Sequence, residues 1–578
     1  MISAFCKGVI YSCKKLFLGC PRVVGMNRNL MNKNNRIAFL LCVAMAAFFL
    51  NACGDSENVN IGGDDIIVSQ DSIDLSQAIY PEGGFYQKNV KVHFNVPEGV
   101  SYLSCTMDGS MPDSATPKSK EPVTIEKSTF IRCNSYNESN NIIKEYNEFY
   151  FINEQTSMPI VAIAVTPYYF DEYISAKPCQ PDPCSNAKFW EDVEYPVHVK
   201  YFPQGVFSKE AAFSINAGIS IIGGISRNQI KKSVSIKLKK KYQNTKINYP
   251  LFDTRPENSS FKSFNLRNYG NRFKSDYVAD AMATSLLEGT GVDYQRSKQV
   301  IVFYNGEYHG IYDMREKLNE DYIENNYHIN GKFVNMVQHE NKRVSLTNGD
   351  LNSYTSLLSF VATHDFSTQE NNSAYDSLKK IMDIENFAKY TVAQIYFQNS
   401  DWPNNNVRAW NSPEHPWKFI LFDVDFGFDW TIPPPGYNAS TNMFQWIIQG
   451  GTTSNPCYNN QKDPCFHIFF AKLIKNPDFQ NLFFQQANLL FENNLNAKEV
   501  SKKIDFVMST IDSNEIKRDL AKFPRDTYKN KCGYGFSVGG SCLKKWAKTR
   551  DSTVQEEFNS FYKQLESKND SNTRSLDN

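Results

Sequence analysis

Four polar residues near the middle of the chain have the types and spacing of a phosphoryl-transfer site. Asp401 is followed five residues later by Asn406, and the hairpin after it ends in segment 423–427, which reads DVDFG. In this chemistry one carboxylate orients the attacking hydroxyl, while an amide oxygen and a later carboxylate hold Mg²⁺ or Mn²⁺ against the phosphates. The spacing predicts Asp401 as the catalytic base and Asn406, Asp425 and Asp423 as metal ligands. The competing interpretation is an ordinary Asp- and Asn-rich loop.

A glycine-containing turn and a basic strand lie upstream of these residues. Two glycines at 223 and 224 precede Arg227, and the following segment 231–238 (KKSVSIKL) carries Lys232 and Lys237. Backbone amides and ammonium groups in such an arrangement favour a polyphosphate. An exposed edge strand protected by lysines explains the same pattern equally well.

The elements that must position these residues predict an α+β fold, with strands first and helices later. Alternating and apolar runs predict strands at 160–165, 195–201, 211–222, 233–238, 300–314 (around an Asn-Gly turn), 407–410 and 418–422. Helical spacing covers 277–287, 351–363, 373–382, 384–397 and much of 478–565.

A separate β-rich module precedes this region. Between residues 77 and 155, short alternating segments are separated by turn sequences such as PEG at 97–99 and DGS at 108–110. Several short strands with such spacing predict a small antiparallel β-sandwich.

The N-terminal segment predicts export. Residues 37–52 are apolar and uncharged, follow Lys33 and Arg36, and are shorter than the roughly 20 residues of a membrane span. Their end, Leu-Asn-Ala-Cys, resembles a bacterial lipobox with Cys53 as the lipidated first residue. An uncleaved anchor or a chance cysteine is the alternative. Residues 1–25 precede a signal that Met26 or Met31 could start on its own, and 1–53 would be removed or lipid-modified.

The predicted location is therefore the cell envelope, on its periplasmic or outer face, with a lipid anchor as the contact with the membrane. Residues 54–76 are polar and acidic, which is typical of a flexible tether.

The cysteines support an oxidising compartment. Of 13 cysteines, eight follow Cys53, and they fall into four local pairs. In an exported protein the expected pairs are Cys105–Cys133, Cys179–Cys184, Cys457–Cys465 and Cys532–Cys542. A zinc site is the competing interpretation, but no Cys-x-x-Cys occurs.

The charge composition of the chain indicates which kinds of partner it can bind. Lys and Arg number 62, as do Asp and Glu, so the chain has no net charge to displace the counterions of a nucleic acid. We expect no nucleic-acid partner. An aromatic content of 14% indicates folded domains with large cores rather than a fibrous or disordered chain.

Several spaced motifs over residues 158–430 resemble the CotH kinase family. They occur in the family's order and read GGISR and KKSVSIKL at 223–238, FNLRN at 264–268, NGEYHGIY at 305–312, then Asp401, Asn406 and DVD at 423–425. The resemblance implies a diverged protein-kinase-like fold, with residues 431–578 as its mainly helical C-terminal extension. It also implies ATP with Mg²⁺ or Mn²⁺ as cofactors, and transfer of the γ-phosphate to Ser or Thr of a secreted or surface protein.

The same resemblance suggests residues that bind the cofactor. Lys232 or Lys237 would contact phosphate, and Arg227 and Glu316 fit positions near the nucleotide. Arg267 would either contact phosphate or pair with a carboxylate. Three tryptophans near the motif either stack on adenine or pack in the core, namely Trp402, Trp410 and Trp430.

The N-terminal sandwich resembles the module at the C-terminal end of chitobiase and β-hexosaminidase-type enzymes, on the strength of PEGGFY at 81–86 and DGSMP at 108–112. This implies contact with glycan through the sandwich. The alternative function is a catalytically silent surface lipoprotein that binds glycan or another envelope component.

Overall fold

The computed structural model describes most of the chain after its N-terminal segment. The described residues are 76–179, 186–340, 343–367, 372–403, 405–428, 442–451, 465–525 and 539–576. The chain divides into two compact units, Met1–Ser72 and Ile73–Asn578, and all described residues belong to the second. The predicted signal sequence, Cys53 and nearly all of the predicted tether lie outside the described residues. Among the described helices, none has both the length and the apolar character needed to cross a bilayer.

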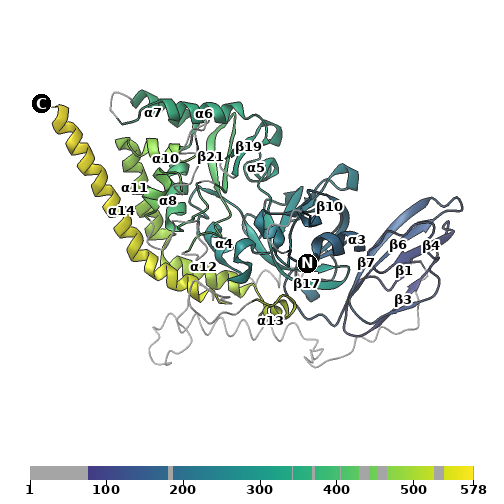
Figure 1. Ribbon diagram of the computed structural model, residues 1–578. Helices are drawn as coiled ribbons and strands as arrows, with labels where there is room; N and C mark the ends of the chain where they lie inside the picture. The colour runs from purple at the N-terminus through teal and green to yellow at the C-terminus, as the bar shows by residue number, and fades with distance from the viewer. Residues whose placement is uncertain are drawn as a thin grey trace, which may run out of the picture. The chain divides into compact units, whose positions relative to one another are not determined.

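Two sheets form the first module, drawn in purple in Figure 1, where the alternating pattern predicts strands. One sheet has the order β1 (Ile79–Tyr80), β3 (Val90–Phe94), β5 (Val123–Ile125), and the other β2 (Gly84–Tyr86), β7 (Ile142–Ile152), β6 (Thr129–Tyr136), β4 (Tyr102–Thr106). Strands β2 and β7 run parallel, so the prediction of a wholly antiparallel module is wrong at this edge. The sheets share a core that includes Val92, Leu103 and Ile131.

Disulfide bonds occur in both the sandwich and the rest of the described chain. Cys105 and Cys133 face each other across β4 and β6 and are joined as the local pairing predicts. Cys179 and Cys465 each take part in a disulfide bond as well. Their predicted partners, and the predicted partner of Cys542, lie outside the described residues; these are Cys184, Cys457 and Cys532. Those three pairings stay predictions.

Seven strands close into a barrel after the sandwich. Their order around the barrel is β10 (Phe213–Ile222), β11 (Ser233–Lys237), β14 (Ser263–Arg267), β17 (Glu307–Glu316), β16 (Ser297–Tyr304), β8 (Ile160–Ala164) and β9 (Tyr195–Phe202). The predicted turn at Asn305 and Gly306 joins β16 to β17, and both residues have positive φ, as a type I′ hairpin turn requires.

The barrel strands are covered on both faces. Val161 and Ile163 of β8 belong to the core inside the barrel. Ile160 and Ala162 belong to a larger core that the barrel shares with the sandwich and the helices. A strand buried on both faces reads as a continuous apolar run, and this explains the sequence IVAIA of β8.

A second lobe combines a five-stranded sheet with most of the helices. The sheet has the order β15 (Asp293–Tyr294), β21 (His415–Leu421), β20 (Val407–Ser412), β18 (Asn335–Glu340), β19 (Arg343–Asn348). The helices are α4 (Ala279–Ser285), α5 (Glu320–Tyr327), α6 (Asn352–Thr363), α7 (Asn372–Ile381), α8 (Ile384–Tyr396), α9 (Met443–Ile448), α10 (Ile468–Leu473), α11 (Pro477–Asn493), α12 (Ala497–Ser509), α13 (Ser513–Lys522) and α14 (Ser541–Leu576).

Helix α8 is the central helix of this lobe and leads directly to the predicted catalytic loop. Its N-cap Asp383 accepts a hydrogen bond from the backbone of Asn386, and the helix is buried along most of its length against α11 and β21. Helices α9 to α14 contribute to the same core as α4 and α8. Figure 1 shows α14 passing along the outside of α11 and α12. The described part of the predicted extension is therefore packed into the lobe.

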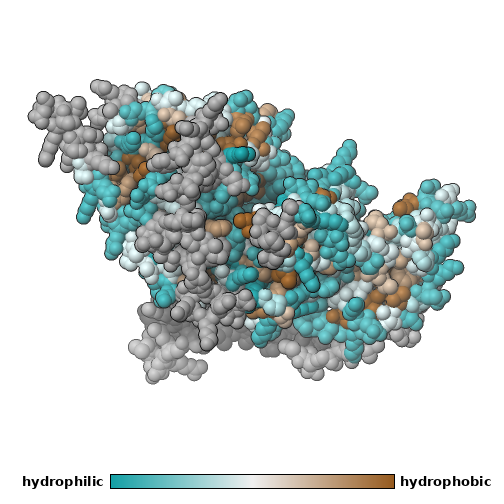
Figure 2. Space-filling model, in the orientation of Figure 1, coloured by the Kyte–Doolittle hydropathy of each residue, from teal (hydrophilic) through white to brown (hydrophobic). Residues whose placement is uncertain are grey.

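The surface differs from the core in character. On the face drawn in Figure 2, hydrophilic residues cover most of the described surface, and apolar residues lie in separate patches. The largest fully buried side chains include Trp402, Trp410 and Trp417. Many of the aromatic residues of the chain therefore lie in the hydrophobic cores.

A buried ion cluster attaches α13 to the barrel. Asp519 of α13 accepts hydrogen bonds from Lys231 Nζ (2.8 Å), Tyr277 OH (2.7 Å) and the backbone nitrogen of Ile311 in β17 (3.0 Å). Asp519 and Lys231 are fully buried, and Arg525 also pairs with Asp519. Burial lowers the pKa of Lys231 to about 8, and the Asp519 charge limits that fall. The cluster therefore depends on the carboxylate.

We expect Asp519→Ala to lower the free energy of unfolding by about 3–5 kcal/mol, because it leaves a buried cation without its partner. Urea unfolding measures the change. Lys522→Ala is the control on the same helix, since the Lys522–Glu307 pair is solvent-accessible and should contribute at most about 1 kcal/mol. Equal losses in the two variants would show that the buried cluster does not hold α13.

Candidate functional site

The predicted catalytic loop begins where α8 ends and is shaped by left-handed backbone. Gln398 (φ 53°), Asn406 (φ 57°) and Asp423 (φ 52°) all have positive φ, which non-glycine residues seldom adopt. Such residues tend to cluster at functional sites, because the surrounding structure must hold them in place. Here they mark the start of the loop, its end, and the turn after β21.

Asp401 and Asn406 lie in direct contact. The Asn406 side-chain nitrogen donates to Asp401 Oδ2 (3.0 Å) and to the backbone oxygen of Asp423 (3.3 Å). Asn405 donates to the other carboxylate oxygen of Asp401 (2.7 Å). Because the Asn406 nitrogen is committed to these acceptors, its amide oxygen is the atom left for a cation.

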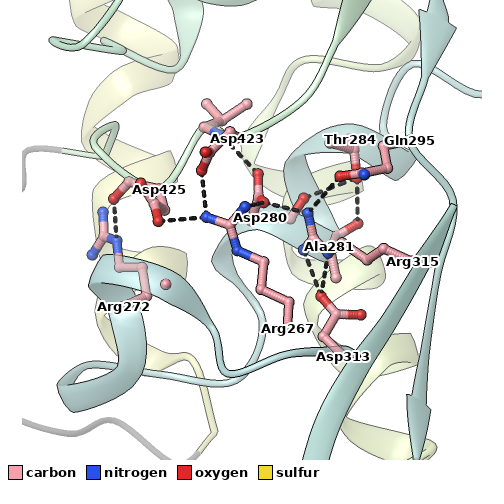
Figure 3. A network of polar contacts seen from close by, with 12 residues as sticks. Arg267, Arg272, Asp280, Ala281, Thr284, Gln295, Asp313, Arg315, Asp423 and Asp425 are labelled. Carbon is pink, nitrogen blue, oxygen red and sulfur yellow. Dashed lines mark hydrogen bonds and ion pairs between the residues drawn. The ribbon is translucent and has the colours of Figure 1, made fainter. Parts of the chain in front are cut away.

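Asp423 and Asp425 share one arginine. Arg267 Nη2, at the end of β14, pairs with Asp423 Oδ1 and, at 2.7 Å, with Asp425 Oδ2. Figure 3 shows the guanidinium between the two carboxylates and Asp280, whose Oδ2 is 3.9 Å from Arg267 Nη1. Of the two roles predicted for Arg267, the structure shows carboxylate pairing.

Asp425 is fixed from several sides. Its Oδ2 also accepts the backbone nitrogen of Asn271 (3.0 Å), and Arg272 Nε donates to its carbonyl oxygen (2.8 Å). Ser400 Oγ donates to the next carbonyl, that of Phe426 (3.0 Å). A Cβ on Gly427 would lie 2.6 Å from the carbonyl oxygen of Phe397, so only glycine fits this turn. The segment 425–427 is thereby held against the end of α8.

Burial changes the acidity of this cluster. It raises the pKa of Asp401 to about 6, and the Asp423 charge adds to the rise while the amides of Asn405 and Asn406 oppose it. It raises the pKa of Asp423 to about 7 against the opposing effect of Arg267. Asp401 is therefore a stronger base than an ordinary aspartate.

The donor atoms fit a hard divalent cation that completes its shell elsewhere. Asp423 and Asp425 supply carboxylates and Asn406 an amide oxygen, the ligand types that Mg²⁺ and Mn²⁺ prefer. Within the part of the chain that the structure describes, no group of three or more His, Cys, Asp or Glu side chains forms a metal site. Mg²⁺ in phosphoryl-transfer sites commonly keeps water and phosphate oxygens as ligands, so a small protein donor set is compatible with it.

The four predicted cofactor-binding residues have other partners. Lys232 donates to the carbonyl of Gln229 (2.6 Å) and lies over the Phe189 ring, and burial lowers its pKa to about 8. Lys237 is 3.6 Å from Glu194. Neither lysine is among the contacts of Asp401, Asp423 or Asp425 that the structure describes.

Arg227 and Glu316 are likewise held elsewhere. Arg227 pairs with Asp192 (2.7 Å) and donates to the carbonyls of Gly223 and Trp190. Glu316 forms a fully buried pair with Arg296 at 2.6 Å. The structure thus brings together the predicted catalytic and metal residues but not the predicted cofactor-binding ones.

The described tryptophans are core residues. Trp402 and Trp410 are fully buried, in two different hydrophobic clusters. Trp410 Nε1 donates to Asp293 (2.8 Å). Trp430 lies outside the described residues. Core packing, one of the two predicted roles, is therefore what the structure shows for the two described residues.

Sequence reasoning missed the charges behind the site. Asp280 of α4 pairs with Arg315 and accepts the backbone nitrogen of Val424 (2.7 Å), which fixes the turn between Asp423 and Asp425. Burial opposes ionisation of Asp280, but Arg315 and Arg267 hold its pKa below the ordinary value. Arg315 also pairs with Asp313. The sequence does place these charged residues within apolar runs, which predicts that they are buried. A buried charge requires a partner of opposite charge, so such residues indicate ion pairs inside the protein.

Comparison with solved structures gives a distant match. It is to a chain of the Shewanella oneidensis MR-1 toxin–antitoxin system of HipA, HipB and operator DNA, with 10% identity and a TM-score of 0.25. The match covers 54% of this chain and 65% of that one, so this chain spans less than two thirds of it. A similarity this low carries no argument about fold or function. Comparison with curated proteins gives no match.

Comparison with protein families agrees with the motifs. The model described as CotH kinase protein matches residues 219–557, which is more than half of the chain. The matched range contains Asp401, Asn406, Asp423 and Asp425, and it continues past residue 430 through α9 to α13 and into α14. With this match and the site geometry together, the chain belongs to the CotH kinase family.

Proposed function

We propose that this protein is an exported lipoprotein kinase that transfers the γ-phosphate of ATP to Ser or Thr of a secreted or surface protein. The observation that carries the proposal is the contact of Asn406 with both Asp401 and the turn that bears Asp423. It joins the candidate base to the candidate metal ligands. The predicted signal sequence, and Cys53 at the end of a lipobox-like segment, support export and anchoring.

Each residue has a defined role in this proposal. Asp401 orients the substrate hydroxyl and accepts its proton as the oxygen attacks the γ-phosphorus and the β,γ-bridging oxygen leaves with ADP. Asn406, Asp423 and Asp425 would hold Mg²⁺ or Mn²⁺, which when bound neutralises charge on the phosphates. The raised pKa of Asp401 lets it take up the proton near neutral pH.

A second candidate function rests on a cavity away from this site. It has a volume of about 550 Å³ and lies between the sandwich and the barrel. Glu145, Asn147 and Glu148 of β7 line one side, and His198 and Lys200 of β9 the other. Lys200 pairs with Glu148 at 2.8 Å, so these two opposite charges in the lining neutralise each other.

The chemistry of this cavity favours an uncharged, hydroxyl-rich ligand. Burial lowers the pKa of His198 to about 4, so this histidine is neutral, with its ring nitrogens on Asn216 and Ser214. Gln77 lines the cavity, and its side-chain oxygen is buried with no hydrogen-bond partner among the described residues. A sugar hydroxyl could satisfy this acceptor. The cavity therefore supports glycan binding by this protein, with or without kinase activity.

For the kinase proposal, we expect the wild-type protein to autophosphorylate or label a secreted substrate with γ-labelled ATP, and Asp401→Asn to reduce the rate at least a hundredfold. Scintillation counting of labelled protein measures it. Asp253→Asn, at an exposed position in the segment between β11 and β14, is the matched control and should retain full activity. Equal labelling of the Asp401 variant and wild type would remove Asp401 from catalysis.

The raised pKa of Asp401 predicts a pH-dependent stability difference in metal-free protein. Between the ordinary value of 3.8 and about 6 the folded state keeps a proton that the unfolded state loses, so stability falls as pH rises. Asp401→Asn escapes this loss, and we expect it to be more stable than wild type by about 1–3 kcal/mol at pH 7.5 but not at pH 4. Denaturant unfolding with EDTA measures both.

The control for this measurement is a residue whose pKa is shifted in the opposite direction, downward. Hydrogen bonds from Ser367 lower the pKa of Asp365, so its contribution to stability is lost as pH falls. Asp365→Asn should therefore be slightly less stable than wild type at pH 7.5. A wild-type protein that gains stability from pH 4 to 7.5 relative to Asp401→Asn contradicts the prediction.

For the glycan proposal, we expect Gln77→Leu to abolish wild-type signals on a glycan array, because it removes the unsatisfied acceptor. Asp401→Asn should keep those signals, since it lies outside the cavity. Absence of any wild-type signal, or signals that Gln77→Leu leaves intact, would count against this cavity as a glycan site.

A further inference from the structure

One nitrogen atom holds the two carboxylates that the site offers to a metal. Arg267 Nη2 contacts Asp423 Oδ1 and Asp425 Oδ2, and its partner Asp425 is only 1% exposed. The three aspartates at 401, 423 and 425 have this single guanidinium within ion-pair distance among the described residues. The cluster therefore keeps an excess of negative charge.

A divalent cation would compete with Arg267 for the same two carboxylates. Mg²⁺ and Mn²⁺ bind carboxylate oxygens directly, with oxygen–metal distances near 2 Å. A guanidinium and a metal ion cannot occupy the same side of Asp423 Oδ1 and Asp425 Oδ2 at once. Each carboxylate keeps a second oxygen that Arg267 does not contact, but a dication bound there would lie close to the guanidinium and be repelled by it. Metal binding is therefore favoured when Arg267 leaves at least one of the two carboxylates.

The Arg267 side chain lies at a solvent-accessible edge of the cluster. Its side chain is 17% exposed and that of Asp423 is 25% exposed, so this edge of the cluster is open to solvent. Gly270 (φ 56°) packs against the pair, and a Cβ there would lie 2.5 Å from Arg267 Nη2. Glycine leaves the space in which the guanidinium sits.

We propose that Arg267 is an internal counter-cation of the metal site, which a divalent metal replaces on Asp423 and Asp425 and which then binds the nucleotide phosphates. The inference rests on the proposed function. Arginine suits both states, because its planar donor fork matches carboxylates and phosphates alike. The exchange couples binding of the metal to binding of the nucleotide, because the metal releases the arginine that then contacts the phosphates.

The test measures binding of MnCl₂ and of a non-hydrolysable ATP analogue to the full chain, by electron paramagnetic resonance of free Mn²⁺ and by calorimetry. We expect Arg267→Gln to bind Mn²⁺ alone at least fivefold more tightly than wild type, since the competitor is gone. It should bind the analogue with Mn²⁺ at least fivefold more weakly, since a phosphate ligand is lost. The two changes have opposite signs.

Arg296→Gln is the control, because Arg296 is a more deeply buried arginine whose carboxylate partner is Glu316 rather than Asp423 or Asp425. It should leave both affinities within twofold of wild type. If Arg267→Gln does not fold, Arg267→Lys tests the same directions, since one ammonium cannot reproduce the planar fork.

The outcomes separate this inference from the proposed function. If wild type binds Mn²⁺ and the analogue but Arg267→Gln weakens both, or changes neither, the counter-cation role is overturned and the kinase proposal stands. If wild type binds neither Mn²⁺ nor the analogue, both are overturned.

Discussion

The pairing of the Asp423 and Asp425 carboxylates with Arg267 is the interaction on which the site depends. Asp423 and Asp425 come from the turn after β21, whereas Arg267 ends β14 of the barrel. Two carboxylates this close in a buried place do not both ionise without a cation beside them. The contact therefore sets the charge of the site and also joins the helical lobe to the barrel at this point.

A chain of ion pairs extends this junction into both lobes. Asp280 of α4 contacts Arg315 of β17 and, more distantly, Arg267, and it also holds the backbone of the metal-site turn. On the far side, Asp519 of α13 binds Lys231, just before the strand β11 that pairs with β14. Residues near the C-terminus thus help to fix the strand that carries Arg267, which is a physical reason for the family match to continue past residue 430.

Much of the fold could be predicted from the sequence, because its strands and helices carry clear periodicity. The hairpin turn at Asn305, helix α8 and the loop from Asp401 to Asn406 lie where the pattern places them. The partners of individual basic residues could not be predicted. Strand alternation does not reveal whether the side chain of Lys232 or Lys237 points toward the site once the sheet closes into a barrel. In the structure both lysines have other partners. The choice of Arg267 between phosphate and carboxylate depends on contacts more than 150 residues away in sequence.

The site uses an arginine as its cation, and two lysines just before β11 show what burial does to an ammonium group. Burial lowers the pKa of Lys231 to about 8, even with Asp519 beside it, and that of Lys232 to about 8 as well. Burial also opposes the charge of Arg267, but the carboxylates of Asp423, Asp425 and Asp280 raise its pKa well above the ordinary value. The guanidinium therefore remains a cation whether it faces carboxylates or phosphate, and only such a group can change partners without losing its charge.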